Sequence, residues 1–277
     1  MKQLYIPTFN KLTKVDKEFL KLNPNAMQEK NPDIVVVSGG DGSLLHAIQD
    51  YGYHGVPFFG IAAGTVNFLM NEVNIADLEK DKFINLNIIE SYTLQVKVIR
   101  KRTNGSVRRV FQATATNDIV LGNRIMDYND FEIKGIKELS DNEQLSGFTF
   151  RPVTEKEKPH RVKGMGLVFS TALGSTAFFT NNHGEIIENM TGKTIGVATI
   201  VSDLENSFNL HTELEDKIRV TIKSERTKCS MYIDGETQVF ELKRGDKVIV
   251  TKGPKVKLAF LDLENFKEKR KKMVKSK

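Results

Sequence analysis

The sequence has a single cysteine, Cys229, and no tryptophan. One cysteine excludes an internal disulfide and any metal site built from several thiolates. No stretch approaches the ~18 consecutive apolar residues that a membrane span requires. The first residues also lack the apolar run and small-residue cleavage site of a signal peptide. We therefore expect a cytoplasmic protein without a membrane partner.

The composition fits a folded globular chain, with 277 residues, of which 39% are hydrophobic and 27% are charged. This length favours two domains. Residues 264–277 hold seven Lys or Arg and two Glu, which accounts for +5 of the net charge of +6. We expect residues 263–277 to form a solvated basic tail. The remainder shows no alternation of basic and aromatic residues, so no nucleic-acid partner is expected.

A glycine-rich turn, Gly39-Gly40-Asp41-Gly42-Ser43, follows the β-branched run Asp33–Val37 and precedes residues with helical spacing, Leu44–Ile48. This order predicts a buried parallel strand, a tight turn and the N-terminus of a helix. Glycines allow a ligand to approach the backbone, and a helix N-terminus attracts phosphate. The carboxylate of Asp41 suits such a turn if it holds a metal, accepts a proton or caps the helix.

A second strand is predicted at Val56–Ile61, followed by the small-residue loop Ala62–Thr65. Two strands joined by a helix form a parallel βαβ unit, whose ligands bind at the carboxyl ends of the strands. From about residue 91 the apolar residues alternate, and Asn104-Gly105 and Asp234-Gly235 are hairpin signals. We therefore predict an α/β domain at 1–90 and an antiparallel β domain at 91–262.

Three polar clusters interrupt the second domain: Thr116-Asn117-Asp118, Gly174-Ser175-Thr176-Ala177-Phe178 and Asp234-Gly235-Glu236. Ordinary turn chemistry alone accounts for the last of them. Taken in order with the Asp41 turn, with Gly60–Gly64 leading to Phe68-Leu69, and with Gly166–Thr171, these clusters resemble the NAD kinase family. The resemblance runs from about residue 33 to about residue 262. It implies a Rossmann-like domain, a β-sandwich domain, an active site between them, and a homo-oligomer, dimer or tetramer.

The resemblance also implies roles for individual residues. Asp41 is the expected base, which takes the proton of the adenosine ribose 2′-hydroxyl of NAD as that oxygen attacks the γ-phosphate. Asn117 and Asp118 match the family's Asn-Glu pair, which holds the dinucleotide. The expected phosphate contacts are Gly39, Gly40, Gly42 and Ser43, and the expected nucleotide contacts are Phe68, Thr176 and Ala177. ATP or polyphosphate is the expected donor, and Mg²⁺ is expected to arrive with ATP and to need no cage of protein ligands.

The sequence departs from the family pattern at Met165 and Phe178, and also in the segments 181–184 and 197–203. Met165 stands where Asp is usual, and Phe178 stands where Tyr is usual. Both remove polar groups near the expected nicotinamide end of the pocket, each worth ~1–3 kcal/mol in a buried site. They leave open a change of substrate, for example to NADH or another adenosine nucleotide.

Two alternatives to an NAD kinase stay open. One is a relative that binds NAD(H) or another nucleotide without turnover, such as a sensor. The other is a lipid kinase of the diacylglycerol or sphingosine type, which shares the Gly-Gly-Asp-Gly turn and a Gly-Thr-x-Asn resembling Gly64–Asn67. The Gly-Ser-Thr-Ala segment argues against the lipid kinase.

Overall fold

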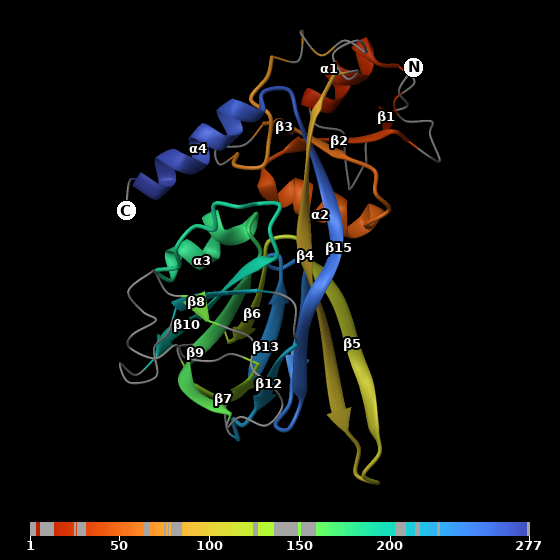
Figure 1. The fold of residues 1–277 in the computed structure, drawn as a ribbon. Helices are drawn as coiled ribbons and strands as arrows, with labels where there is room; N and C mark the ends of the chain where they lie inside the picture. The colour runs from red at the N-terminus through yellow and green to blue at the C-terminus, as the bar shows by residue number, and fades with distance from the viewer. Residues whose placement is uncertain are drawn as a thin grey trace. The chain divides into compact units, whose positions relative to one another are not determined.

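The computed structural model describes residues 4–5, 14–24, 26, 32–63, 67–74, 76, 78, 85–123, 127–135, 149–150, 159–202, 209–213, 217–225 and 228–275. The chain forms two compact units (Figure 1). Unit 1 comprises Met1–Ser91 and Lys255–Lys277, and unit 2 comprises Tyr92–Pro254. Two long strands, β4 (Asn87–Lys101) and β15 (Lys247–Phe260), contribute residues to both units.

Unit 1 contains a parallel sheet in the order β1 (Leu4–Tyr5), β2 (Ile34–Gly39), β3 (Phe58–Ala62) and the last part of β15. Leu258 of β15 pairs with Phe58 of β3. Strand β3 also pairs with β2, from Phe58 and Val35 to Ala62 and Gly39. The central strands are almost wholly apolar because both of their faces are covered, as in other parallel sheets.

Helices cover the two faces of this sheet. On one face, Phe19 of α1 (Lys14–Leu22) packs against Val36 and Ile61. On the other, Tyr51 of α2 (Asp41–Tyr51) lies edge-on to Phe58, with 6.0 Å between the ring centroids. Successive side chains of β2 and β3 point to opposite faces of the sheet, and those on both faces are buried, which agrees with a helix on each side.

A third helix, α4 (Leu263–Lys275), follows β15 directly. Its N-terminus is held by Asp262, whose side-chain oxygen accepts the N–H of Asn265 at 2.9 Å. Phe266 stacks on Phe260 with 4.3 Å between centroids, and Phe266 and Arg270 are buried. The expectation of a solvated basic tail is therefore wrong, because two side chains one turn apart anchor a helix there.

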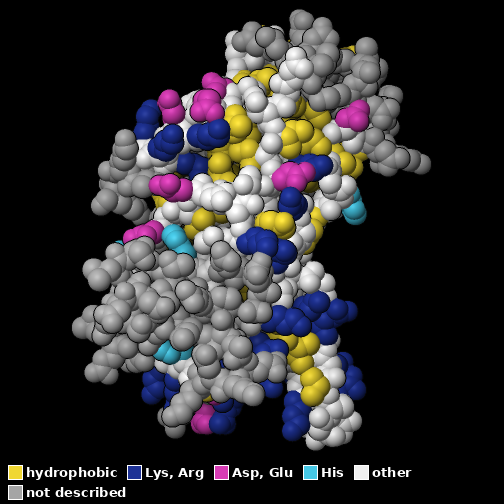
Figure 2. All heavy atoms as spheres, in the orientation of Figure 1, with side chains coloured by type: hydrophobic (Ala, Val, Ile, Leu, Met, Phe, Trp, Pro, Cys, Tyr) yellow, Lys and Arg dark blue, Asp and Glu magenta, His cyan; other side chains and the backbone are white. Residues whose placement is uncertain are grey.

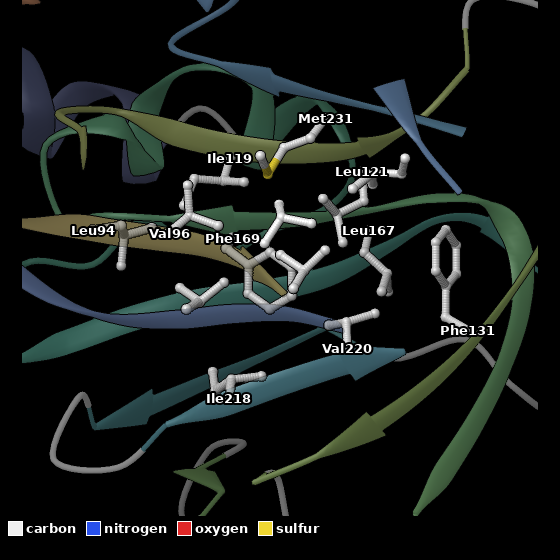
Figure 3. Packing of buried hydrophobic residues seen from close by; sticks show 14 of the residues in the cluster. Leu94, Val96, Ile119, Leu121, Phe131, Leu167, Phe169, Ile218, Val220 and Met231 are labelled. Carbon is white, nitrogen blue, oxygen red and sulfur yellow. The ribbon is translucent and has the colours of Figure 1, made fainter. Parts of the chain in front are cut away.

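Unit 2 is built of mostly antiparallel strands around one apolar core. Besides parts of β4 and β15 its strands are β5 (Val107–Ala115), β6 (Asp118–Gly122), β7 (Asn129–Lys134), β8 (Thr149–Phe150), β9 (His160–Ser170), β10 (Thr194–Ser202), β11 (Asn209–Glu213), β12 (Ile218–Ile222), β13 (Cys229–Ile233) and β14 (Gln238–Leu242). Figure 3 shows how Leu121 of β6, Leu167 and Phe169 of β9, and Val220 of β12 meet in this core, where all four are fully buried.

Strand β9 occupies a central place in unit 2, since it pairs with β10 on one side and with β6 and β7 on the other. It ends at Ser170, where a 3-10 turn (Gly174–Thr176) leads into the short helix α3 (Phe178–Asn181). The ring of Phe179 packs closely against the backbone at Gly184 and Gly196, where an added Cβ would lie 2.3 Å from it. These contacts hold α3 in place.

The predicted fold class is confirmed: an α/β unit is followed by a mostly antiparallel β unit. The predicted division at residue 90 falls beside the start of unit 2, but residues 255–262, predicted for the second domain, belong to unit 1. Among the helices that the structure describes, none combines the length and apolar character that a membrane crossing requires.

Truncation of a core side chain tests this account of unit 2. We expect Leu167→Ala to lower the free energy of unfolding by about 2–5 kcal/mol, because the cavity cannot close in a packed core. Val239→Ala is the matched control, since Val239 is 51% exposed. Urea unfolding followed by circular dichroism measures both, and equal midpoints for the two variants would contradict the core as described.

Candidate functional site

The glycine turn after β2 has a backbone that only glycine adopts without strain. Gly39 has a φ of +139°, and a Cβ there would lie 2.4 Å from the side-chain oxygen of Ser43. The N–H of Ser43 donates to the carbonyl of Gly40 at 3.0 Å, while the N–H of Ala63 donates to Gly39 at 2.8 Å. The turn is therefore tied to the segment after β3, as expected for two loops at the same end of a parallel sheet.

Asp41 is the first residue of α2, and main-chain groups hold its carboxylate. Its Oδ2 accepts the N–H of Phe68 at 3.0 Å, and its Oδ1 accepts the N–H of Leu69 at 2.8 Å. Burial raises the pKa of Asp41, while these two hydrogen bonds and the nearby positive charge of Lys269 lower it. The carboxylate is thus fixed in direction, and a partly buried environment increases its basicity.

The other residues of this group surround the same turn. Gly42 is exposed, and Gly40, Ser43 and Phe68 are half-buried. Residues 64–66, which include the second half of the predicted loop Ala62–Thr65, lie outside the described residues. Within the described part of the chain, no three His, Cys, Asp or Glu side chains gather in a way that could hold a metal ion.

A second polar cluster, in unit 2, forms where β6 begins. The carboxylate of Asp234 accepts the N–H of Thr116 at 2.8 Å, of Asn117 at 2.6 Å and of Asp118 at 3.1 Å. The N–H of Asp234 donates to the carbonyl of Asp118 at 3.0 Å. One buried acid therefore satisfies three consecutive main-chain donors and fixes the turn that carries Asn117 and Asp118.

The side chains of this turn are buried but only partly satisfied. Among the described residues, the Oδ1 of Asn117 has no hydrogen-bond partner, although the residue is only 8% exposed. Burial and the charge of Asp234 raise the pKa of Asp118 to about 7, against a small opposite effect from the N–H of Gly235. A buried acceptor without a partner is costly, so this position favours a ligand that donates a hydrogen bond.

The 3-10 turn after β9 lies directly against this cluster. Thr171 donates its N–H to the carbonyl of Asn117 at 2.8 Å and its hydroxyl to the carbonyl of Thr116 at 2.6 Å. An added Cβ at Gly174 would lie 2.2 Å from the carbonyl oxygen of Asn117. The Gly174–Thr176 segment thus requires glycine where two backbones touch, and the structure brings together two motifs 55 residues apart.

The predicted pocket residues after this turn differ in exposure. Thr176 is buried, Ala177 is half-buried and Phe178 is 40% exposed. The next residue, Phe179, is instead fully buried in a small second apolar cluster with Val168 and Ala198. Of the two adjacent phenylalanines, Phe178 is therefore the one whose side chain a ligand can reach.

Met165 does not join this cluster within unit 2. It lies five residues before Ser170 on β9, which is about 16 Å along an extended strand. Ser170 pairs with Asp118 at the start of β6, whereas Gly166 pairs with Gly122 at its end. Within unit 2, Met165 thus lies apart from Thr176 and Phe178 along β9, and its place in the nucleotide pocket stays a prediction.

Two residues near the clusters escaped the sequence analysis. Asp234 was attributed to turn chemistry, yet its carboxylate holds the Asn117 turn. Lys269 lay in the expected tail, yet its charge acts on Asp41. An acid before a hairpin glycine was a visible signal for Asp234, whereas nothing in the sequence distinguishes Lys269 from the other lysines of α4.

Comparisons with known proteins relate the sequence and the fold of the chain to one group of enzymes. No protein-family model matches the chain. An NAD kinase of Acinetobacter baylyi is 28% identical over 227 residues, which are 80% of this chain and 65% of that protein. An NAD kinase of Lachnospira eligens is 23% identical over 258 residues, covering 86% and 76% respectively. The chain thus spans about two thirds to three quarters of the length of these two relatives.

Solved structures show the same fold. A yeast NADH kinase in complex with NADH superposes with a TM-score of 0.65 at 23% identity, over 84% of this chain and 63% of that one. An NAD kinase from Archaeoglobus fulgidus in complex with ATP gives a TM-score of 0.68 at 18% identity, over the whole of both chains. The chain is a divergent relative of the NAD kinases. Its Asp41 turn lies in unit 1, and its Asn117 and Gly174 segments lie in unit 2 of this NAD kinase fold.

The hydrogen bonds of Asp234 give the first prediction for the site. In Asp234→Asn, the three N–H groups of residues 116–118 lose a charged acceptor, so the free energy of unfolding should fall by about 1–3 kcal/mol. Asp127→Asn, at an exposed position, is the matched control and should change it by less than ~0.5 kcal/mol. Urea unfolding at pH 7 measures both, and indistinguishable stabilities would refute the anchoring role.

The pKa of Asp118 gives a pH-dependent prediction. Its pKa is raised from 3.8 to about 7, so the folded chain keeps a proton that the unfolded chain releases between these values. Stability of the natural chain therefore falls as pH rises through this window, and Asp118→Asn removes that loss. Relative to the natural chain, the variant should gain roughly 1–3 kcal/mol between pH 4.5 and pH 8 in urea unfolding. A difference that is independent of pH would show that Asp118 titrates normally.

Proposed function

We propose that this protein is an NAD kinase, which transfers the γ-phosphoryl group of ATP to the 2′-hydroxyl of the adenosine ribose of NAD and so makes NADP. In the transfer, the 2′-oxygen forms a bond to the γ-phosphorus as the bond to the bridging oxygen of ADP breaks. Asp41 takes the proton of the hydroxyl. The curated relatives named NAD kinase support this activity.

The observation that carries the proposal is the fixed carboxylate of Asp41 at the N-terminus of α2. Both of its oxygens accept main-chain N–H groups at 2.8–3.0 Å, so its direction is set before any substrate arrives. Each oxygen keeps a lone pair, because a carboxylate accepts about four hydrogen bonds. A secondary hydroxyl is a poor nucleophile at neutral pH, and a positioned base accelerates its attack by ~10²–10⁴-fold.

The donor is proposed to bind beside this carboxylate. The exposed backbone of Gly42 and the N-terminus of α2 suit the phosphates of ATP or of polyphosphate. The related archaeal structure contains ATP, which supports ATP as the donor. Mg²⁺ is proposed to arrive with ATP, where it would neutralise phosphate charge.

The acceptor is proposed to bind to the Asn117 cluster of unit 2. The buried Oδ1 of Asn117 suits a donor such as the adenine amine, and Asp118 suits a ribose hydroxyl. Phe68, Thr176, Ala177 and Phe178 are proposed to line the nucleotide pocket. NADH is a further candidate substrate, because the related yeast enzyme is an NADH kinase and Phe178 lacks the usual hydroxyl.

Several further expectations remain proposals. They are a cytoplasmic location, assembly into a homo-oligomer, and the absence of nucleic-acid and membrane partners.

Turnover of NAD and of NADH with ATP and Mg²⁺ tests the proposed function. We expect NADP, NADPH or both from the natural chain, and a loss of kcat of ~10²–10⁴-fold in Asp41→Asn. Calorimetry should give nearly unchanged NAD binding for that variant, since the base acts in the transition state. The product is identified by mass spectrometry.

Asp50→Asn is the matched control, because Asp50 is an exposed acid at the other end of the same helix. It should keep full activity. Tight NAD binding without product from the natural chain would overturn the kinase and leave a nucleotide-binding protein. Phosphorylation of a lipid in vesicles without NADP formation would point to the lipid kinase.

A further inference from the structure

The hairpin of β4 and β5 ends in a strongly basic segment. Between Tyr92 and Asn117 the sequence contains no Asp or Glu. Residues 101–109, which include the turn, are all exposed. Figure 2 shows Lys and Arg side chains along this hairpin at the lower right, with no acidic side chain among them in that view. We call its four exposed basic residues the hairpin cations: Lys101, Arg102, Arg108 and Arg109.

The strand register brings like charges together. Arg108 of β5 lies directly opposite Arg100 of β4, so both side chains share one face of the hairpin. Like charges in opposite positions destabilise a pair of strands. Arg100 is neutralised by Asp246, whose two oxygens lie 2.7 and 2.6 Å from its guanidinium. Among the described residues, Lys101, Arg102 and Arg108 make no such ion pair. The hairpin thus keeps a concentration of positive charge that the described part of the chain does not balance.

The base of the hairpin is firmly packed. Asp246 is fully buried and also accepts the N–H of Lys243 at 2.9 Å. The guanidinium of Arg100 lies over the ring of Phe240, 5.7 Å from its centroid. Phe240 in turn contacts Phe111 of β5, with 4.6 Å between the ring centroids. These contacts fix both strands just before the exposed segment begins.

The turn that joins the two strands is also well defined. The N–H of Arg102 donates to the carbonyl of Ser106 at 2.8 Å, and the N–H of Gly105 donates to the carbonyl of Arg102 at 3.0 Å. The side-chain oxygen of Asn104 accepts the N–H of Ser106 at 3.1 Å. The hairpin cations are therefore carried on an ordered backbone, which lowers the entropic cost of binding a ligand there.

This surface is separate from the Asn117 cluster within unit 2. Arg109 and Ala115 lie six residues apart on β5, which is about 20 Å along an extended strand. Asn117 follows two residues after Ala115. A ligand of the hairpin cations would therefore occupy a different place from a nucleotide bound at Asn117.

The residue types at the end of the hairpin restrict the kind of anion. Residues 101–109 include no aromatic side chain, whereas proteins bind single-stranded nucleic acid largely by stacking its bases on aromatic rings. Their one large apolar side chain is Val107, and a membrane surface requires a larger apolar area to bind. A linear chain of phosphates needs neither, because closely spaced positive charge is enough to bind it.

We propose that the hairpin cations bind inorganic polyphosphate, with the Lys and Arg side chains pairing with phosphate oxygens along the chain. Bound phosphates offset the repulsion between the opposed Arg side chains, so binding should also stabilise the hairpin. This site goes beyond the proposed function, because it needs no phosphoryl transfer and lies outside the motifs assigned to ATP and NAD.

Calorimetry with inorganic polyphosphate at several salt concentrations tests the proposal. The natural chain should bind, and the affinity should fall as salt rises, because bound counterions are released. Arg108→Gln combined with Arg109→Gln should weaken binding at low salt by roughly tenfold. The slope of log Kd against log salt should decrease by roughly 1.4, the value expected for two lost phosphate contacts on a single strand.

Lys228→Gln combined with Lys247→Gln is the matched control, since it removes the same charge from exposed positions of unit 2. It should weaken binding by less than about twofold. Equal losses in the two double variants, or no salt-dependent binding by the natural chain, would overturn the proposal. Arg108→Lys combined with Arg109→Lys keeps the charge and should keep the affinity; a loss as large as that of the glutamine pair would contradict binding by charge.

Two competing anions test the choice of ligand. Duplex DNA and vesicles containing phosphatidylserine should bind more weakly than polyphosphate at the same phosphate concentration. Tighter binding of either one, lost in the Arg108→Gln and Arg109→Gln variant, would overturn polyphosphate as the ligand.

Activity measured on the same variants separates this inference from the proposed function. With ATP as donor, the arginine-to-glutamine pair should leave kcat nearly unchanged. Polyphosphate binding by a chain that makes no NADP or NADPH would refute the proposed function and leave the hairpin site standing. Product formation by a chain that does not bind polyphosphate would do the reverse.

Discussion

Two main-chain hydrogen bonds, from Phe68 and Leu69 to the carboxylate of Asp41, are the interaction on which unit 1 depends. These hydrogen bonds offset the cost of burying the negative charge of Asp41 in a turn that is otherwise suited to binding anions. They also bind the segment after β3 to the start of α2. Gly39 permits the turn, and Asn71 ties the same segment to β3 and β15. The geometry of the proposed base therefore follows from backbone contacts that exist before any ligand binds.

In unit 2, as in unit 1, a carboxylate accepts hydrogen bonds from main-chain N–H groups, but here it anchors a turn. Asp234 accepts three successive N–H groups, and its charge remains inside the fold because those donors replace water. Within the described residues, this leaves the buried Oδ1 of Asn117 without a hydrogen-bond partner. Burial and, after it, the charge of Asp234 raise the pKa of Asp118. Asp234 thus anchors the turn and also contributes to the protonation of its neighbour.

Much of this arrangement was predictable from the sequence, where the signal is local. The β-branched run before Gly39 and the helical spacing after Asp41 predicted β2 and α2, and Asn104-Gly105 predicted the hairpin of β4 and β5. The second half of β15 was not predicted, because Lys252, Pro254 and Lys255 hide the alternation of a strand that continues to Phe260. Helix α4 was taken for a tail because its charge obscured the two side chains, Phe266 and Arg270, that it buries.

The candidate site also contains residues that the sequence predicts and residues that it does not. Asp41, Asn117 and Asp118 could be selected because each lies in a recognisable motif. The contacts made by Asp234 and Lys269 could not be predicted from the sequence, because they join residues far apart in the chain, such as Asn117 and Asp234. Met165 was grouped with the pocket through its motif, yet the register of β6 and β9 places it in the middle of β9, just past the end of β6. Only pairing in three dimensions reveals such separations.

The central claim is that the Asp41 turn serves transfer to one hydroxyl group. The most direct measurement supplies ATP labelled with ³²P at the γ-position together with either NAD or an analogue that lacks the 2′-hydroxyl of the adenosine ribose. The account predicts label in the dinucleotide from NAD and none from the analogue. Equal labelling of both compounds, or of neither, would contradict it.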